Sequence, residues 1–120
     1  MPATSFDATV RSAEGRAVIH LRGQIDGGAK DALGAVYERA IEGDADDVLL
    51  NFADVDYINS TGIALIVGLL GRARAEGRTL AACGLSEHYR EIFEITRLAD
   101  FIAIYTDEAS ATAEDEEDPR

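Results

Sequence analysis

The sequence predicts an α/β fold, in which a mixed, mostly parallel β-sheet is covered by α-helices in one domain. Two observations support this prediction. Apolar and polar residues alternate over residues 6–12 and 16–21, as in half-buried strands, and the short turn between them predicts an antiparallel hairpin. Farther along, short apolar runs alternate with helical patterns, which is typical of parallel strands joined by right-handed helical crossovers. The expected order is β-β-α-β-α-β-α-β.

The first helix is expected directly after the hairpin. Asp26, or Gly27 beside it, is a suitable N-cap because a short polar side chain can accept a hydrogen bond from the first turn. Apolar residues then recur at helical spacing over residues 29–41, which predicts an amphipathic helix of about four turns. The Gly-Asp pair at 43–44 ends it.

The remaining elements follow in alternation. Residues 47–52 are apolar apart from one asparagine, which favours a central strand covered on both faces. A loop and a second helix occupy residues 54–70, and a short strand is expected over 79–83. Ser86 is a good N-cap for a third helix, and residues 101–105 form the last predicted strand.

Length and charge narrow the classes of function. The chain has 120 residues and a net charge of −12, which suits one domain and disfavours binding to nucleic acid or to an anionic membrane. We expect the domain to span residues 5–106. The acidic segment 107–120 is expected to begin with a short helical piece and then to be disordered. A single cysteine and the lack of signal-peptide or membrane-span patterns predict a cytoplasmic protein.

Three consecutive residues that commonly cap helices occur in the middle of the 54–70 segment. These residues are Asn59, Ser60 and Thr61, and we expect Asn59 or Ser60 to cap the second helix. Gly62 has no side chain, so we expect it to leave the Ser60 hydroxyl accessible at the positive helix end. A phosphate group there would meet free backbone N–H groups and would add roughly −1.5 to −2 charge. The alternative is that Ser60 is a plain cap without regulation.

The helix that begins here is apolar throughout residues 63–70. One face is expected to pack on the sheet. The other face is either part of the core or an exposed surface for a partner, and the periodicity leaves both possibilities open. Gly68 and Gly71 would permit close approach of another backbone.

The segment from Asp54 to Leu70 resembles the signature of STAS domains, specifically bacterial anti-sigma factor antagonists. That family has Asp-Ser-Ser/Thr-Gly-Leu at the start of a largely apolar helix, and this chain has Asn-Ser-Thr-Gly-Ile at 59–63. Residues 23–26 are similar to the family's Gly-x-Ile/Leu-Asp before its first helix. The expected element order is also the family's, and the similarity extends over about residues 5–106.

The resemblance implies partner switching without catalysis by this chain. In the family, the unphosphorylated antagonist binds an anti-sigma factor that is also a serine kinase, and a sigma factor is released. The kinase phosphorylates the motif serine, here Ser60, and a serine phosphatase restores it. The ATP belongs to the kinase, so no cofactor or metal is expected here, and we expect a monomer or a weak dimer. The partner-binding residues implied by the motif matches are Asp26, Asn59, Ser60, Thr61, Gly62 and Ile63.

One position departs from the family pattern. Asn59 replaces the usual aspartate, so it keeps the capping hydrogen bond but lacks the charge beside the phosphorylated serine. This departure leaves open an alternative function, that of a scaffold STAS subunit in a signalling assembly that is never phosphorylated.

Catalysis by Ser60 as a small serine hydrolase is the alternative from a different class. The Gly-x-Ser-x-Gly pattern is absent, and His20 and His88 are the available bases. Cys83 is predicted to be a buried structural thiol. The aspartates at 44–47 are predicted to form a solvated turn, because a calcium loop needs a later glutamate.

Two interpretations are open for the three arginines that end the second helix: charge stabilisation of the helix terminus or contact with an acidic partner. These arginines are Arg72, Arg74 and Arg78.

Overall fold

Five strands form one sheet in the order β1-β2-β3-β4-β5. The computed structural model describes residues 6–13 and 15–111. β1 pairs with β2 in antiparallel orientation, and the three other neighbouring pairs are parallel, so the predicted mixed sheet is confirmed. The strands are β1 (Asp7–Ala13), β2 (Arg16–Ile25), β3 (Asp47–Ile58), β4 (Thr79–Cys83) and β5 (Ala103–Tyr105).

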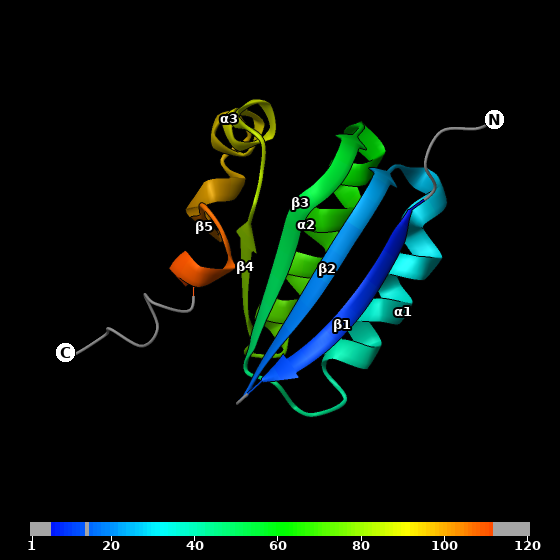
Figure 1. Ribbon diagram of the computed structural model, residues 1–120, viewed down its shortest axis with the longest axis vertical. Coiled ribbons are helices and arrows are strands. Elements are labelled where there is room, and N and C mark those ends of the chain that lie inside the picture. Colours follow the sequence, from blue (N-terminus) through cyan, green and yellow to red (C-terminus); the bar gives the residue numbers. More distant parts are fainter. Residues whose placement is uncertain (1–5, 14, 112–120) are drawn as a thin grey trace.

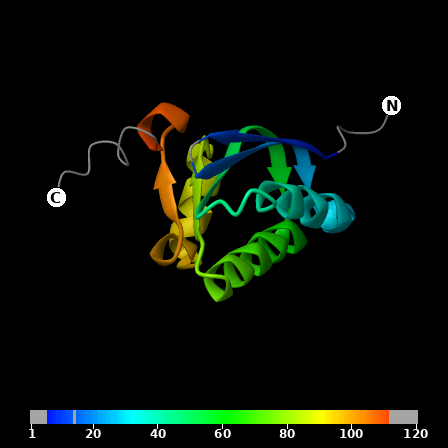
Figure 2. The same cartoon turned by 90° about the horizontal axis from the view of Figure 1, so that it is seen from below.

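Three α-helices connect the parallel strands, in the order expected from the sequence. Figure 2 shows α1 and α2 next to each other on one face of the sheet, while α3 lies beyond the end of β4 (Figure 1). The opposite face, which carries Val18, Leu49, Asn51 and Cys83, is called the outer face below. The helices are α1 (Lys30–Ala40), α2 (Ser60–Ala75) and α3 (Glu87–Ile95), with 3-10 turns η1 (Gly27–Ala29) and η2 (Leu98–Asp100).

The main core lies between the sheet and the helices. Alternate residues of β2 and β3 point into it, and the apolar faces of α1 and α2 cover them. Phe93 of α3 adds an edge-to-face contact with Phe52, with ring centroids 6.1 Å apart. Each large side chain buried here contributes about 1.5–3 kcal/mol of hydrophobic stabilisation. The main contributors from the strands and helices are Ala17, Ile19, Leu21, Leu33, Val36, Tyr37, Val48, Leu50, Phe52, Ile66, Leu69 and Leu70.

A polar cluster joins the C-terminal ends of α1 and α2. Glu76, which caps α2, accepts hydrogen bonds from the Tyr37 hydroxyl (3.2 Å), from Arg72 Nε (2.9 Å) and from Arg78 Nε (3.0 Å). Arg72 also pairs with Glu38 of α1 at 2.8 Å. Two of the three arginines are therefore engaged in holding the helices together.

The third arginine, Arg74, has a different surrounding. Its guanidinium lies 5.3 Å from the centroid of the Phe101 ring, which is 56% exposed. Because this contact is at the surface, contact of Arg74 with an acidic partner stays a prediction.

Two strands differ in length from the prediction. The apolar run ends at Phe52, but β3 continues to Ile58 because β2 also continues to Ile25 and pairs with it across two register shifts. The loop expected from residue 54 therefore begins only after Ile58. β5 begins at Ala103 rather than at 101, since Phe101 follows η2 and faces solvent.

The chain stays packed beyond residue 106, where the domain was expected to end. Residues 108–111 form one helical turn, and Ala111 is 1% exposed against the outer face. The disorder predicted for the rest of the acidic segment concerns residues 112–120, which lie outside the described residues.

Candidate functional site

The motif predicted to carry the function lies at the carboxyl ends of two adjacent parallel strands. β2 ends at Ile25 and β3 at Ile58, and the Asn59 N–H donates to the carbonyl oxygen of Ile25 at 3.2 Å. The loops that follow the carboxyl ends of parallel strands lie together at one edge of the sheet. Their side chains can therefore act on the same ligand, and such edges commonly bind ligands. Here the loop after β2 and the loop after β3 meet.

Asn59 is the N-cap of α2, one of the two residues expected for this role. Its backbone is extended, with φ −94° and ψ −177°, and its Oδ1 accepts a hydrogen bond from the Gly62 N–H at 2.8 Å. The Ile63 N–H donates to the Asn59 carbonyl at 2.9 Å and begins the helical hydrogen-bond ladder. The helix start is thereby fixed at Ser60.

Ser60 is the first residue of α2 and is exposed. Its hydroxyl makes no hydrogen bond to any other described residue. The first backbone N–H groups of a helix have no partner inside it and carry partial positive charge, so an anion attached to this hydroxyl would be favourably placed. Thr61, also exposed, follows it and lies beside the Gly27 backbone of η1.

Gly62 has a role other than the one expected for it. It is buried, and a Cβ atom added to it would lie 2.0 Å from the carbonyl oxygen of Ile25. Glycine is required here because the helix start packs directly on the end of β2. Gly62 and the half-buried Ile63 thus belong to the interior side of the site, and the contact of Gly62 with a partner stays a prediction.

Asp26 lies on the neighbouring loop, as the sequence suggested. It caps η1, and its Oδ1 accepts a hydrogen bond from the Gly28 N–H at 2.9 Å. η1 contacts α2. The end of β2 and the start of α2 therefore bring Asp26, Asn59, Ser60 and Thr61 to one edge of the molecule.

A tyrosine of the third helix supports this edge. Tyr89 of α3 is half-buried, and its hydroxyl accepts a hydrogen bond from the Ile58 N–H at 2.9 Å. The bond fixes the last residue of β3 immediately before the capping residue. A tyrosine on an apolar helix face was the available signal, since a buried hydroxyl needs a partner.

α2 has both a core face and an exposed apolar face. Ile66, Leu69 and Leu70 are buried, whereas Val67 is 45% exposed. The second face is therefore exposed rather than part of the core, and its contact with a partner stays a prediction. The exposed stripe begins one turn after Ser60 and consists of Ala64, Val67, Gly68 and Gly71.

A catalytic role for Ser60 finds no base in the geometry. His20 Nε2 lies 2.6 Å from Asp54 Oδ2, and the His88 ring packs on Tyr89. Neither histidine hydrogen-bonds to Ser60. Within residues 6–13 and 15–111 there is also no group of three or more side chains able to hold a metal ion.

Cys83 is fully buried, as expected for a structural thiol. Burial, together with the nearby carboxylates of Glu108 and Asp107, raises the pKa of the thiol to about 11. A thiol with such a pKa is almost entirely protonated at neutral pH and reacts slowly.

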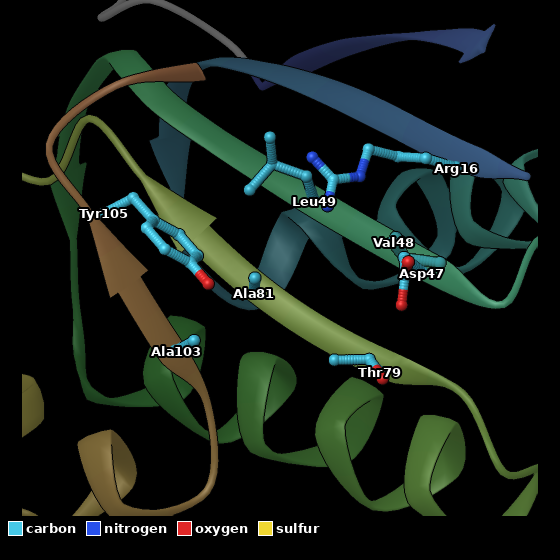
Figure 3. Close-up of a pocket in the computed structure, with 8 residues that line it drawn as sticks. All are labelled: Arg16, Asp47, Val48, Leu49, Thr79, Ala81, Ala103 and Tyr105. Carbon is cyan, nitrogen blue, oxygen red and sulfur yellow. The ribbon is translucent and has the colours of Figure 1, made fainter. Parts of the chain in front are cut away.

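A shallow hollow on the outer face lies at the other ends of the strands (Figure 3). It is lined by residues that include Arg16, Asp47 and Thr79, which begin β2, β3 and β4, and its volume is about 50 Å³. Pockets for small organic ligands are typically about 300–1,000 Å³. The edge that carries Ser60 is thus separate from this hollow.

The fold and the site together are those of a small α/β domain that presents a loop and a capped helix start at the carboxyl edge of its sheet. The family model of the STAS domain matches residues 7–111. The chain belongs to the STAS domain family. No helix in the described part of the chain has both the length and the apolar character needed to cross a bilayer.

Relatives and solved structures agree with this assignment. The chain is 38% identical over 58 residues to an anti-sigma-B factor antagonist of Staphylococcus epidermidis, a match that covers 48% of this chain and 54% of that protein. The chain thus spans about half the length of the curated relatives it matches.

Two solved structures share the fold at low sequence identity. An anti-sigma factor antagonist from Mycobacterium paratuberculosis has a TM-score of 0.80 at 16% identity, covering 94% of this chain and 96% of the other. The unphosphorylated anti-sigma factor antagonist SpoIIAA has a TM-score of 0.70 at 18% identity, covering 96% and 100%.

Proposed function

We propose that this protein is a cytoplasmic, non-catalytic anti-sigma factor antagonist that acts by partner switching. In its unphosphorylated form it binds an anti-sigma factor that is also a serine kinase, and a sigma factor is released. Phosphorylation of Ser60 abolishes the binding, and a serine phosphatase restores it. The names of the curated relatives and the family motif support this proposal.

The position of Ser60 carries the proposal. Its exposed hydroxyl stands at the first residue of α2, next to the exposed apolar stripe of the same helix. A phosphate attached there would add roughly −1.5 to −2 charge at the edge of any partner docked on this stripe. In the free protein the helix dipole would stabilise the phosphate. Docking of an apolar partner surface would remove water from this charge, which costs free energy and so opposes binding.

Ser60→Asp and Ser60→Ala test the proposal. Both changes are at an exposed position and leave the Asn59 cap in place. We expect Ser60→Ala to bind the cognate anti-sigma factor as the wild type does, and Ser60→Asp to bind at least tenfold more weakly. Mapping of phosphate after incubation with the kinase and ATP should find it on Ser60. Equal binding by both variants would contradict partner switching.

The scaffold function is a second candidate because of Asn59. Its Oδ1 is committed to the Gly62 N–H, so the residue acts as a cap and brings no carboxylate beside Ser60. A scaffold subunit would bind its partners without ever taking up phosphate. Absence of phosphate on Ser60 with every cognate kinase, together with retained binding, would favour the scaffold.

A further inference from the structure

The end of the described chain lies on the outer face of the sheet. Residues 106–111, called the C-terminal strap below, follow β5 and pack on residues of β2, β3 and β4. Glu108 Oε2 accepts a hydrogen bond from Asn51 Nδ2 at 2.7 Å, and Glu108 Oε1 pairs with Arg11 of β1 at 2.5 Å. One carboxylate thus joins the strap to two strands that are not neighbours in the sheet.

The strap covers an apolar floor. Ala111 is 1% exposed and packs with Val18, Leu49 and Cys83, which come from β2, β3 and β4. Inside the strap, Asp107 Oδ1 accepts from the Ser110 N–H at 2.8 Å, which holds the turn together. The strap is therefore a small preformed unit with one apolar contact and one carboxylate anchor.

The floor continues into the hollow described above. Leu49 belongs both to the floor and to the lining of the hollow, and Tyr105 lies at the other side of it (Figure 3). Solvent therefore reaches the border of the strap. A reagent in the hollow would meet Cys83 once the strap moved away.

The strap's attachment is weak compared with the sheet below it. β5 pairs with β4 through three residues, whereas β2 and β3 pair through nine. Beyond that short pairing, the strap is held by the Glu108 bonds, by a backbone bond from the Gly84 N–H to the Thr106 carbonyl (3.1 Å) and by the Ala111 contact. Segments with few buried contacts open at lower free energy than the global unfolding of the domain.

We propose that the C-terminal strap is a latch, held by Glu108, that opens without unfolding the sheet and uncovers the apolar floor of Val18, Leu49 and Cys83. In the closed state the strap itself occupies this surface. The latch lies on the opposite face from α2, so it is independent of the partner switching proposed for Ser60.

Labelling of Cys83 with a thiol reagent measures the opening, because this is the sole cysteine of the chain. We expect Glu108→Ala to raise the labelling rate about tenfold or more, since both anchoring bonds are lost. The matched control is Glu94→Ala, an exposed acid on α3, which should leave the rate unchanged.

Asn51→Asp is the sharper variant. It keeps the oxygen that accepts from the Ala53 N–H at 2.9 Å, but it places a carboxylate against Glu108. The added negative charge disfavours the reactive thiolate, so faster labelling would have to come from opening. Combining Asn51→Asp with Glu108→Gln should restore slow labelling, because the new amide can donate to the new carboxylate.

The dependence of labelling on urea separates opening from global unfolding. The latch predicts a labelling rate at low urea that changes little with urea, while the unfolding midpoint of Glu108→Ala stays close to that of the wild type. The proposal is overturned if labelling follows global unfolding in every variant, or if Asn51→Asp labels no faster than the wild type.

Discussion

A methyl group on Gly62 would lie 2.0 Å from the carbonyl oxygen of Ile25, far inside van der Waals contact. The start of α2 and the end of β2 are therefore fitted to each other through a position without a side chain. We expect Gly62→Ala to destabilise the domain by about 2–4 kcal/mol, because helix and strand must separate. Chemical denaturation measures the change, and the capping hydrogen bond from the Gly62 N–H should be weakened in amide hydrogen exchange.

Gly68→Ala is the matched control for this prediction. It lies in the same helix, and a Cβ added there would meet nothing within 4 Å. Alanine is favoured over glycine in a helix interior by about 0.5–1 kcal/mol, so the variant should be as stable as the wild type or more stable. Equal destabilisation by both variants would mean that backbone freedom, and not the contact with Ile25, explains Gly62.

Asn59 is predicted to act through its side-chain oxygen. Asn59→Ala removes the acceptor for the Gly62 N–H and should cost about 0.5–2 kcal/mol of stability. Asn59→Asp keeps the acceptor and adds a negative charge at the helix N-terminus, so it should be at least as stable as the wild type. Denaturant midpoints of the three proteins test the order. A midpoint for Asn59→Ala equal to that of the wild type would show that the cap contributes nothing.

The exposed apolar stripe of α2 is predicted to be the docking surface. Val67→Asp places a charge on the stripe at a residue that is 45% exposed, so stability should change by less than about 1 kcal/mol. Binding to the cognate anti-sigma factor should weaken about tenfold or more if the stripe is desolvated in the complex. Ile95→Asp is the control, because Ile95 is 74% exposed on α3. If both variants bind as the wild type does, the partner docks elsewhere.

The stability of the domain is predicted to fall at low pH because of Glu76. Its hydrogen bonds with Arg72 and Arg78 lower the pKa of this carboxyl group from its ordinary value of 4.5. The pKa is thus lower in the folded than in the unfolded state. The stabilisation from Glu76 is therefore complete above pH 4.5 and is lost as the pH falls through the folded-state pKa.

Glu76→Gln tests this dependence. The variant should be less stable than the wild type at neutral pH, and the difference should shrink as the pH is lowered below 4.5. Thermal unfolding over a series of pH values measures both effects. A difference that stays constant across the whole series would assign the role of Glu76 to packing rather than charge. Glu42→Gln, at an exposed residue after α1, serves as the reference.

Local signals made most elements predictable. Asp26, Asn59 and Ser86 each accept a hydrogen bond from the turn they precede, as expected for capping residues. Capping depends on neighbours two or three residues away, so it can be read from a short stretch of sequence. The parallel orientation of β2 to β5 follows in the same way from the alternation of strands and helices along the chain.

The missed features depend on partners far along the chain. The extension of β3 to Ile58 comes from pairing with the end of β2, although the alternation of Asp54, Val55, Asp56 and Tyr57 was a signal with period two. The purpose of Gly62 appears only when the Ile25 carbonyl is placed next to it.

Glu108 shows a second reason for missed features. It is one of seven acids after residue 106, so the composition predicts a solvated segment. The composition does not indicate which of these carboxylates bonds to Asn51 and Arg11. Sequence separation of 57 and 97 residues makes these contacts invisible to any local pattern.

The strands occupy the sheet in the order in which they occur in the chain. During synthesis, each new strand therefore finds its neighbour already made and never has to insert between two formed strands. The edge that carries Ser60 is built from β2, η1, β3 and α2, all of which precede β4, while the Tyr89 hydroxyl that fixes Ile58 comes later with α3. A nascent chain arrested after residue 75 and released from the exit tunnel would already contain the elements that carry Ser60, while the outer face would still lack its cover.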